Sequence, residues 1–268
     1  MSSARPFTLV RGTRPLLVSL PHTGRVIPPA LAARLAPRAL AVEDTDWHLE
    51  RLYDFVPALG ASLLVPHYSR YVIDLNRPRD DTPMYAGANN TGLVPLTFFS
   101  GEPLYCAGAQ PDSDEVAERV AVYWQPYHDA LATELARLRR RHGIALLWDG
   151  HSIRSELPWL FDGRLPDLNL GTARGSSCAP ELRALLHARL AAQSRFSHVT
   201  DGRFTGGYIT RHCGRPADRI HAVQMEMCWS CYLDETQPAS WDETRAAAAR
   251  ALLRALLAGL LSWKPADA

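Results

Sequence analysis

A short apolar run at residues 144–147 leads directly into Trp-Asp-Gly-His-Ser at residues 148–152. Such a run predicts a buried β-strand, so we expect His151 at the tip of that strand. Two other runs are similar: residues 16–20 precede Pro-His-Thr-Gly, which contains His22, and residues 223–227 contain Glu226. Because open α/β sheets place their sites outside the carboxyl ends of their strands, these residues indicate a site with two histidines and a carboxylate.

Apolar β-like runs alternate with helical patterns along the chain, which is typical of an α/β protein with a largely parallel or mixed sheet. Two segments rich in turn-forming residues, 78–111 and 155–175, are expected to be long loops. A Ser-Trp-Asp-Glu capping box at residues 240–243 is expected to start the last helix. The predicted strands are 16–20, 62–66, 71–75, 144–148, 207–210 and 221–227, and the predicted helices are 46–56, 114–142, 180–193 and 241–263.

Composition limits the class of protein. The 268 residues are 47% hydrophobic and carry a formal charge of +1, so neither nucleic acid nor a membrane is expected as a partner. Residues 246–261 are the most apolar stretch, but Arg250 and Arg254 interrupt it, which predicts an amphipathic helix. Residues 1–13 lack the apolar core of a signal peptide, and five cysteines without a regular framework fit a reducing cytoplasm. The sequence leaves the oligomeric state open.

His22 and His151 are candidate metal ligands. A neutral imidazole is a common zinc ligand, and a catalytic zinc takes three protein ligands and a water molecule. A single histidine more often caps a turn or fills a place in the core. Two histidines at strand tips, each beside a glycine, leave metal binding and a structural role equally open.

The third ligand is less obvious from the residues alone. Asp46 lies in the acidic segment 43–46 and could reach a metal from the start of a helix, or it could simply cap that helix. Asp149 lies two residues before His151, so on an extended chain both side chains point the same way. Asp149 could therefore orient the imidazole of His151, or it could satisfy turn amides.

Glu226 lies in the apolar run 222–228. Alternation along a strand puts Gln224, Glu226 and Cys228 on one face. A buried carboxylate is costly unless it is paired or functional. Glu226 is therefore either on the wet face of an edge strand or a general base beside a metal.

Several arginines flank the predicted strand ends and glycine loops. Each one alone would be a surface ion pair, but several near one metal would suit a substrate with carboxylates, because the planar guanidinium binds carboxylate bidentately. A serine hydrolase that uses Ser152 as its nucleophile is a further alternative, but the sequence lacks the Gly-x-Ser-x-Gly turn that usually carries such a serine. The arginines concerned are Arg70, Arg77, Arg154 and Arg211.

Six segments together make the sequence resemble the N-formylglutamate amidohydrolase (deformylase) family, and they extend from near residue 15 to about residue 235. The resemblance implies a three-layer α/β/α fold, with residues 1–268 as one catalytic domain. Its central sheet would be mixed and mostly parallel, as in the zinc carboxypeptidases and aspartoacylase. The segments are residues 19–24, 44–48 with 52–53, 70–78, 149–153, 206–211 and 224–226.

The resemblance also implies one bound zinc ion, or another divalent metal, held by His22, Asp46 and His151. Zinc carboxypeptidases have a glutamate three residues after the first histidine, whereas this chain has Arg25. The third ligand must therefore come from elsewhere, and we expect Asp46, with Asp44 as the alternative.

The activity that the resemblance implies is hydrolysis of N-formyl-L-glutamate to formate and L-glutamate, a step of histidine degradation. Glu226 would be the general base and acid. Asn76 and Arg77 would hold the α-carboxylate, and Arg154 or Arg211 the side-chain carboxylate. Two alternatives are a related zinc deacylase or carboxypeptidase for another N-acyl amino acid or peptide, and a non-catalytic sensor of acidic metabolites. A sensor needs no base, so Glu226 argues against it.

Overall fold

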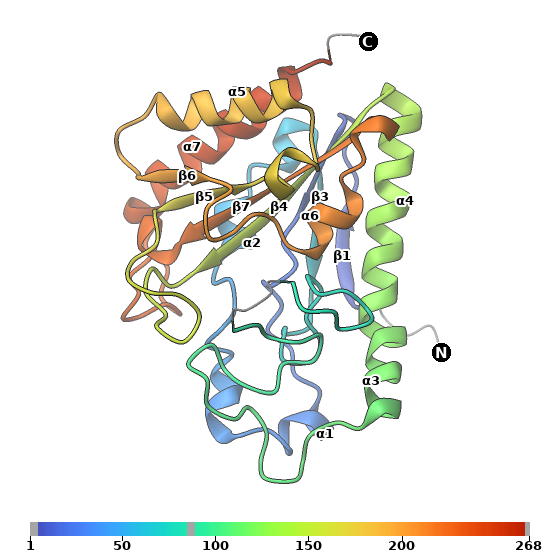
Figure 1. The fold of residues 1–268 in the computed structure, drawn as a ribbon, viewed down its shortest axis with the longest axis vertical. Coiled ribbons are helices and arrows are strands. Elements are labelled where there is room, and N and C mark those ends of the chain that lie inside the picture. Colours follow the sequence, from blue (N-terminus) through green and yellow to red (C-terminus); the bar gives the residue numbers. More distant parts are fainter. Residues whose placement is uncertain (1–4, 85–88, 266–268) are drawn as a thin grey trace.

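The computed structural model describes residues 5–84 and 89–265, and a seven-stranded sheet forms its centre (Figure 1). The strand order is β1-β3-β2-β4-β7-β5-β6. β1 pairs with β3, and β5 with β7, in antiparallel fashion, and the other neighbours are parallel. The mixed, mostly parallel sheet confirms the predicted fold class. The strands are β1 (Phe7–Val10), β2 (Leu16–Ser19), β3 (Ser62–Pro66), β4 (Ala145–Ile153), β5 (Leu168–Gly171), β6 (His198–Thr200) and β7 (Ile220–Cys228).

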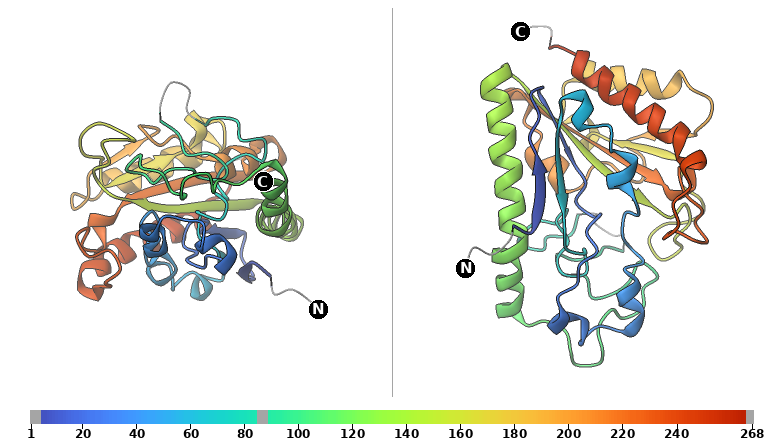
Figure 2. Two further views of the ribbon diagram at one scale, coloured as in Figure 1. Left: turned by 90° about the horizontal axis from the view of Figure 1, so that it is seen from below. Right: turned by 180° about the vertical axis from the view of Figure 1, so that it is seen from behind.

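Helices cover both faces of the sheet (Figure 2). α4 and α6 pack on one face, α2 and α7 lie on the other, and α5 packs against α7. No helix in residues 5–84 or 89–265 combines enough length with enough apolar character to cross a bilayer. The α-helices are α1 (Pro29–Ala32), α2 (Leu49–Leu52), α3 (Ser113–Arg119), α4 (Gln125–His142), α5 (Pro180–Ala191), α6 (Tyr208–Cys213) and α7 (Glu243–Ser262).

Alternation along β4 divides its side chains between the two helical layers. Trp148 Nε1 donates to the Tyr53 hydroxyl at 2.8 Å, next to α2. Asp149 faces the other layer, where its Oδ2 accepts from Thr210 Oγ1 of α6 at 3.2 Å. His151 follows two residues later and therefore shares the face of Asp149.

The parallel register extends this polar face across the neighbouring strands. Ser19 of β2 and Gln224 of β7 both pair with Asp149, and Glu226 pairs with His151. All nine residues of β4 and of β7 are buried. The carboxyl-terminal halves of the two central strands thus carry polar side chains into the protein interior, at the edge of the sheet where α/β proteins form their sites.

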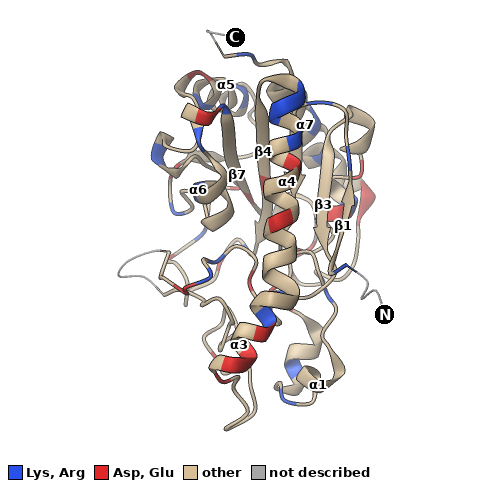
Figure 3. Cartoon of the chain, turned by 90° about the vertical axis from the view of Figure 1, so that its right-hand side faces the viewer, with Lys and Arg blue, Asp and Glu red and all other residues tan. Residues whose placement is uncertain are grey.

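The predicted helix 114–142 is built from three consecutive pieces. α3 leads through a π-helical turn, Val120–Trp124, into α4. Asp112 caps the start, since its Oδ1 accepts from the backbone N–H of Glu115 at 2.9 Å, and Gly143 at φ +74° ends α4. Acidic residues lie near the start of α3 and basic residues at the end of α4, the distribution that the helix dipole favours (Figure 3).

Two predicted strands are wrong. Residues 71–75 form turns, in which the backbone N–H of Asp74 donates to Leu93 O rather than to a neighbouring strand. Residues 207–210 open α6 instead. Conversely, β1, β5 and β6 were not predicted, because runs of three or four residues are too short to show alternation. β5 interrupts the predicted loop 155–175.

Four local expectations are corrected as well. β4 continues to Ile153, so His151 lies within the strand rather than at its tip. Most of the predicted helix 46–56 is missing, because His48 at φ +58° delays α2, which then ends after one turn. The cap of α7 is Asp242, whose side chain accepts from Arg245 N, rather than Ser240. β7 lies between β4 and β5, which excludes the edge-strand interpretation of Glu226.

His128 of α4 provides a test of the packing between α4 and α6. Its ring stacks on Trp124 with centroids 3.8 Å apart and lies against Tyr208 of α6 at 5.5 Å. Its Nε2 donates to Leu75 O at 2.9 Å. Burial lowers the pKa of His128 to about 3, so the folded protein keeps this ring neutral at pH 5.

The unfolded chain binds a proton at His128 near its ordinary pKa, whereas the folded chain does not. Burial of neutral His128 therefore costs no stability above about pH 6.5. The free energy of unfolding decreases as the pH falls from there toward 3. We expect wild-type protein to lose about 2 kcal/mol more stability than a His128→Gln variant between pH 7.5 and pH 5. Urea unfolding at the two pH values measures this difference, and equal losses in the two proteins would contradict it.

Candidate active site

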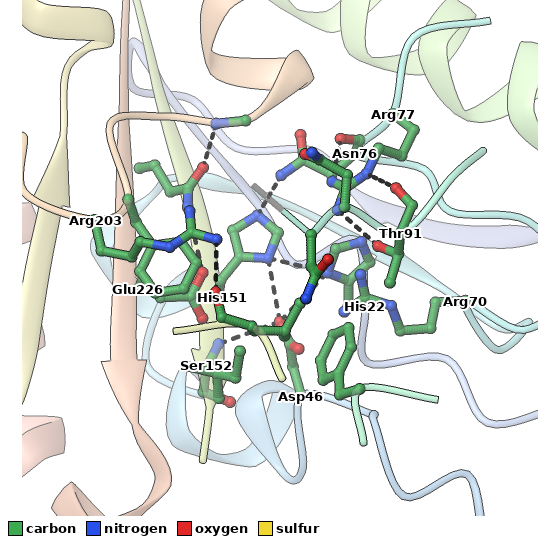
Figure 4. Close-up of a pocket in the computed structure, with 18 residues that line it drawn as sticks. His22, Asp46, Arg70, Asn76, Arg77, Thr91, His151, Ser152, Arg203 and Glu226 are labelled. Carbon is green, nitrogen blue, oxygen red and sulfur yellow. Dashed lines mark hydrogen bonds and ion pairs between the residues drawn. The ribbon is translucent and has the colours of Figure 1, made fainter. Parts of the chain in front are cut away.

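A pocket opens at the carboxyl ends of β2, β4 and β7 (Figure 4). Its walls come from these strands, from the loop after β2, from the turns at residues 70–77 and from the loop before α6. The lining includes acidic, basic and imidazole side chains at short range. The polar residues that line it include His22, Asp46, Arg70, Asn76, Arg77, Thr91, His151, Ser152, Arg203, Gln224 and Glu226.

His22, Asp46 and His151 form a buried group that could hold a metal ion, and we call these three residues the metal-ligand group. Their potential ligand atoms all lie within 4.8 Å of one another. His151 Nδ1 is 3.2 Å from His22 Nδ1 and 3.2 Å from Asp46 Oδ2, and His22 Nδ1 is 3.8 Å from Asp46 Oδ2. Zinc–ligand bonds of about 2.0–2.2 Å at tetrahedral angles separate ligand atoms by roughly 3.3–3.6 Å. The three side chains therefore fit a divalent metal ion without rearrangement.

Asp74 orients His22 within this group. His22 Nε2 donates to Asp74 Oδ1 at 2.7 Å, which leaves Nδ1 directed at Asp46 and His151. Burial lowers the pKa of His22, and a neutral imidazole is the form that binds a metal. Burial alone would raise the pKa of Asp74, but Arg70, whose Nη2 donates to Asp74 Oδ2 at 2.5 Å, and His22 hold it well below its usual range.

Asp46 joins the histidines, whereas Asp44 does not. The backbone N–H of Ser152 donates to Asp46 Oδ2 at 3.2 Å, and α2 has no side-chain cap, so Asp46 does not cap that helix. Asp44 Oδ2 instead accepts from the Tyr71 hydroxyl at 2.9 Å and from Phe99 N at 3.0 Å. Burial raises the pKa of Asp44 to about 6. Asp44 thus fixes the chain around residue 99.

His151 is held by two polar neighbours on its other side. Its Nε2 lies 3.2 Å from Asp149 Oδ1 and 3.0 Å from Asn76 Nδ2. Ile209 N donates to Asn76 Oδ1 at 2.8 Å, which fixes the orientation of that amide. Burial lowers the pKa of His151, but Asp149 and Asp46 outweigh it and raise the pKa well above its ordinary value. Asp149 thus occupies the place expected of a residue that orients His151.

Glu226 lies beside the metal-ligand group. Gln224 Nε2 donates to Glu226 Oε2 at 3.3 Å, and Gln224 Oε1 accepts from Gly207 N at 2.6 Å, so the amide is locked. Burial raises the pKa of Glu226 to about 8. A carboxyl group that titrates near neutral pH can both accept and return a proton. Cys228, expected on the same face, does not line the pocket and directs its Sγ to Pro166 O.

Two arginines that the sequence singled out line the pocket. Arg77 is rigid, because its Nε and Nη2 donate to Thr91 O at 2.7 Å and to Thr91 Oγ1 at 2.8 Å. Arg70 lies over the Phe99 ring at 4.5 Å, and within the described part of the chain its buried Nε has no hydrogen-bond partner. A buried guanidinium N–H without a partner is unusual, and this one belongs to a residue of the pocket lining.

Arg154 and Arg211 lie outside the pocket. Arg154 Nη1 donates to Glu235 O at 2.8 Å, and its guanidinium lies over Trp229. Arg211 Nε donates to Gly206 O at 2.8 Å, and this side chain lines a separate surface hollow. Arg203, which sequence reasoning missed, lines the pocket instead.

Ser152 is not arranged as a nucleophile. Its Oγ lies 2.7 Å from the Tyr232 hydroxyl, and that hydroxyl donates to Trp47 O at 2.7 Å. The Ser152 hydroxyl therefore donates to Tyr232 rather than to a base. The geometry favours the metal-ligand group over the serine alternative.

Comparison with known proteins agrees with this geometry. The model of the N-formylglutamate amidohydrolase family matches residues 14–233. This chain belongs to the N-formylglutamate amidohydrolase family. The N-formylglutamate deformylases of Pseudomonas aeruginosa and Pseudomonas putida are 54% and 51% identical to it over 253 residues. The alignments cover 94% of this chain and 95% and 94% of those two proteins.

Solved structures support the fold. The crystal structure of N-formylglutamate amidohydrolase from Ralstonia eutropha JMP134 matches with a TM-score of 0.82 and 25% identity, over 96% of this chain and 98% of that one. The gene product Atu2144 from Agrobacterium tumefaciens matches with a TM-score of 0.70 and 17% identity, over 96% of both chains. The second likeness concerns the fold alone.

The geometry predicts different outcomes for two neighbouring aspartates. Asp46→Ala should remove a ligand and lower the zinc content of purified protein to well below one ion per chain. Asp44→Asn should leave the zinc content unchanged, because Asp44 contacts Tyr71 and Phe99 rather than the histidines. Elemental analysis after dialysis against a weak chelator measures both. Loss of zinc from the Asp44 variant with retention in the Asp46 variant would reverse the ligand assignment.

Proposed function

We propose that this protein is a zinc-dependent amidohydrolase that converts N-formyl-L-glutamate to formate and L-glutamate, as the last step of one route of histidine degradation. The main support for the proposal is that the buried His22–Asp46–His151 group and Glu226 line the same pocket, together with several arginines. Two imidazoles and a carboxylate are typical ligands of a catalytic zinc. The names of the two Pseudomonas relatives support the choice of substrate.

The pocket offers binding groups for an acidic substrate. Arg77 presents a guanidinium that Thr91 holds in one orientation, and a rigid planar fork binds a carboxylate with little loss of entropy. Asn76 lines the same wall and is fixed by α6. We assign the α-carboxylate of the substrate to Asn76 and Arg77.

Hydrolysis needs a proton to be moved from water to the leaving nitrogen. When zinc is bound, it polarises the formyl carbonyl and makes water a stronger acid. Glu226 accepts the proton of the attacking water and returns it to the amide nitrogen as the C–N bond breaks. Arg70, whose side chain lines the pocket, donates to the oxygen that becomes negative during the attack.

Two alternatives differ in chemistry. A related deacylase or carboxypeptidase would use the same residues on another N-acyl amino acid or on a peptide, and one methylene group changes binding by only about 1–3 kcal/mol. A sensor would bind the acidic metabolite without hydrolysing it. The position of Glu226 next to the metal-ligand group favours an enzyme, because binding alone requires no proton carrier.

The role of Glu226 gives a direct test of the proposed reaction. Zinc-loaded wild-type protein should release formate from N-formyl-L-glutamate, and Glu226→Gln should lower that rate by about 100-fold or more. The glutamine keeps the shape of the side chain but cannot accept the proton. Coupled formate detection measures the rate, and zinc analysis of the same samples should show equal metal content.

The substrate range separates the alternatives. Preference for the formyl over the acetyl derivative of glutamate, and over a dipeptide, supports the deformylase. Turnover of only the acetyl derivative or the dipeptide would replace it with the related deacylase or carboxypeptidase. Tight binding of N-formyl-L-glutamate without release of formate would support the sensor, and wild-type rates in the glutamine variant would remove Glu226 from the mechanism.

A further inference from the structure

The proposed function leaves the distal carboxylate of the substrate without a binding residue, because Arg154 and Arg211 lie outside the pocket. We propose that Arg203 binds this carboxylate and is the residue that makes the site selective for acidic amino acids. The inference rests on the proposed function, which it extends from the reaction to the choice of side chain.

Arg203 is placed opposite Arg77. In Figure 4, Arg203 lies on one side of the His151 ring, and Arg77 lies on the other side together with His22. A substrate whose amide lies at the metal-ligand group can therefore direct one carboxylate to each arginine. An N-acylated amino acid with a carboxylate in its side chain has this arrangement of charges.

The loop that carries Arg203 is anchored before the substrate arrives. Asp201, at φ +54°, turns the chain after β6, and its N–H donates to Leu170 O at 2.7 Å. Its carboxylate accepts from Thr172 N at 2.7 Å and from Arg183 Nη2 at 3.0 Å. Because these contacts fix the loop, little entropy is lost when Arg203 binds a ligand.

The surroundings of Arg203 suit the side chain of an acidic amino acid. Its Nη2 donates to Leu160 O at 3.1 Å, and its guanidinium lies 5.4 Å from the centre of the Phe204 ring. Leu160 and Phe204 also line the pocket, so they offer apolar contacts for methylene groups next to the carboxylate. Arginine binds such a carboxylate through two parallel hydrogen bonds.

The acidic residues of the pocket lining are occupied elsewhere. Asp46 contacts His22, His151 and the backbone of Ser152. Glu226 Oε2 accepts from Gln224 Nε2 at 3.3 Å. Arg203 therefore adds positive charge to the pocket lining, which suits a substrate carboxylate better than an uncharged side chain.

The test compares N-formyl-L-glutamate with N-formyl-L-glutamine, which has nearly the same shape without the charge. Wild type should prefer glutamate by about 100-fold or more in kcat/KM. Arg203→Met should lose most of that preference. Its kcat/KM should fall by about 100-fold for N-formyl-L-glutamate and by less than about 10-fold for N-formyl-L-glutamine. Arg203→Lys should recover part of it. Arg154→Met is the matched control and should keep the wild-type preference, because Arg154 lies outside the pocket.

Each outcome has a separate meaning. An unchanged preference in folded Arg203→Met protein overturns the role of Arg203 while the proposed function stands. If wild type hydrolyses neither compound, the proposed function fails. Calorimetry with L-glutamate and L-glutamine then decides on Arg203: selective binding of glutamate by wild type and not by Arg203→Met supports its role, and equal selectivity in both proteins overturns it.

Discussion

The parallel register between β4 and β7 is the constraint on which the site depends, because it sets His151 directly beside Glu226. A shift of one residue would turn every side chain of one strand to the opposite face. The two faces of buried β4 have different partners, Tyr53 for Trp148 on one face and Thr210 for Asp149 on the other, and these contacts oppose such a shift. The packing of the core and the position of Glu226 beside His151 are therefore consequences of the same pairing.

Burial of so many ionisable groups is stable only because each has a defined partner. Asp74 is shared between Arg70 and His22, so one carboxylate neutralises an arginine and orients an imidazole. Loss of one member of a buried pair leaves an uncompensated charge, which typically costs about 3–5 kcal/mol. Glu226 differs, since the Gln224 amide rather than an arginine donates to it, and burial raises its pKa to about 8. The residues that surround the metal-ligand group thus combine a rigid frame with one carboxyl group that can change its protonation.

Local patterns identified residues in or next to regular strands, whereas Asp46, Asn76 and Arg77, which lie in turns and loops, were assigned their roles by the family resemblance. His22, His151 and Glu226 follow or occupy apolar runs, and the structure brings them together as expected. Asp74 and Arg203 escaped notice because turns and loops place them, through contacts such as Asp74 N to Leu93 O that span many residues. Arg154 and Arg211 flank the right segments, but sequence spacing does not reveal that their guanidinium groups bind nearby backbone and side-chain oxygens.

The central proposal is that a single metal ion in the His22–Asp46–His151 group makes the pocket a hydrolase. Titration of chelator-treated protein with zinc, following bound zinc and formate release in the same samples, tests that claim most directly. Bound zinc and formate release should rise together and reach their limits at about one zinc per chain. Full release of formate before zinc is added, or zinc bound at that ratio without any gain in rate, would contradict it.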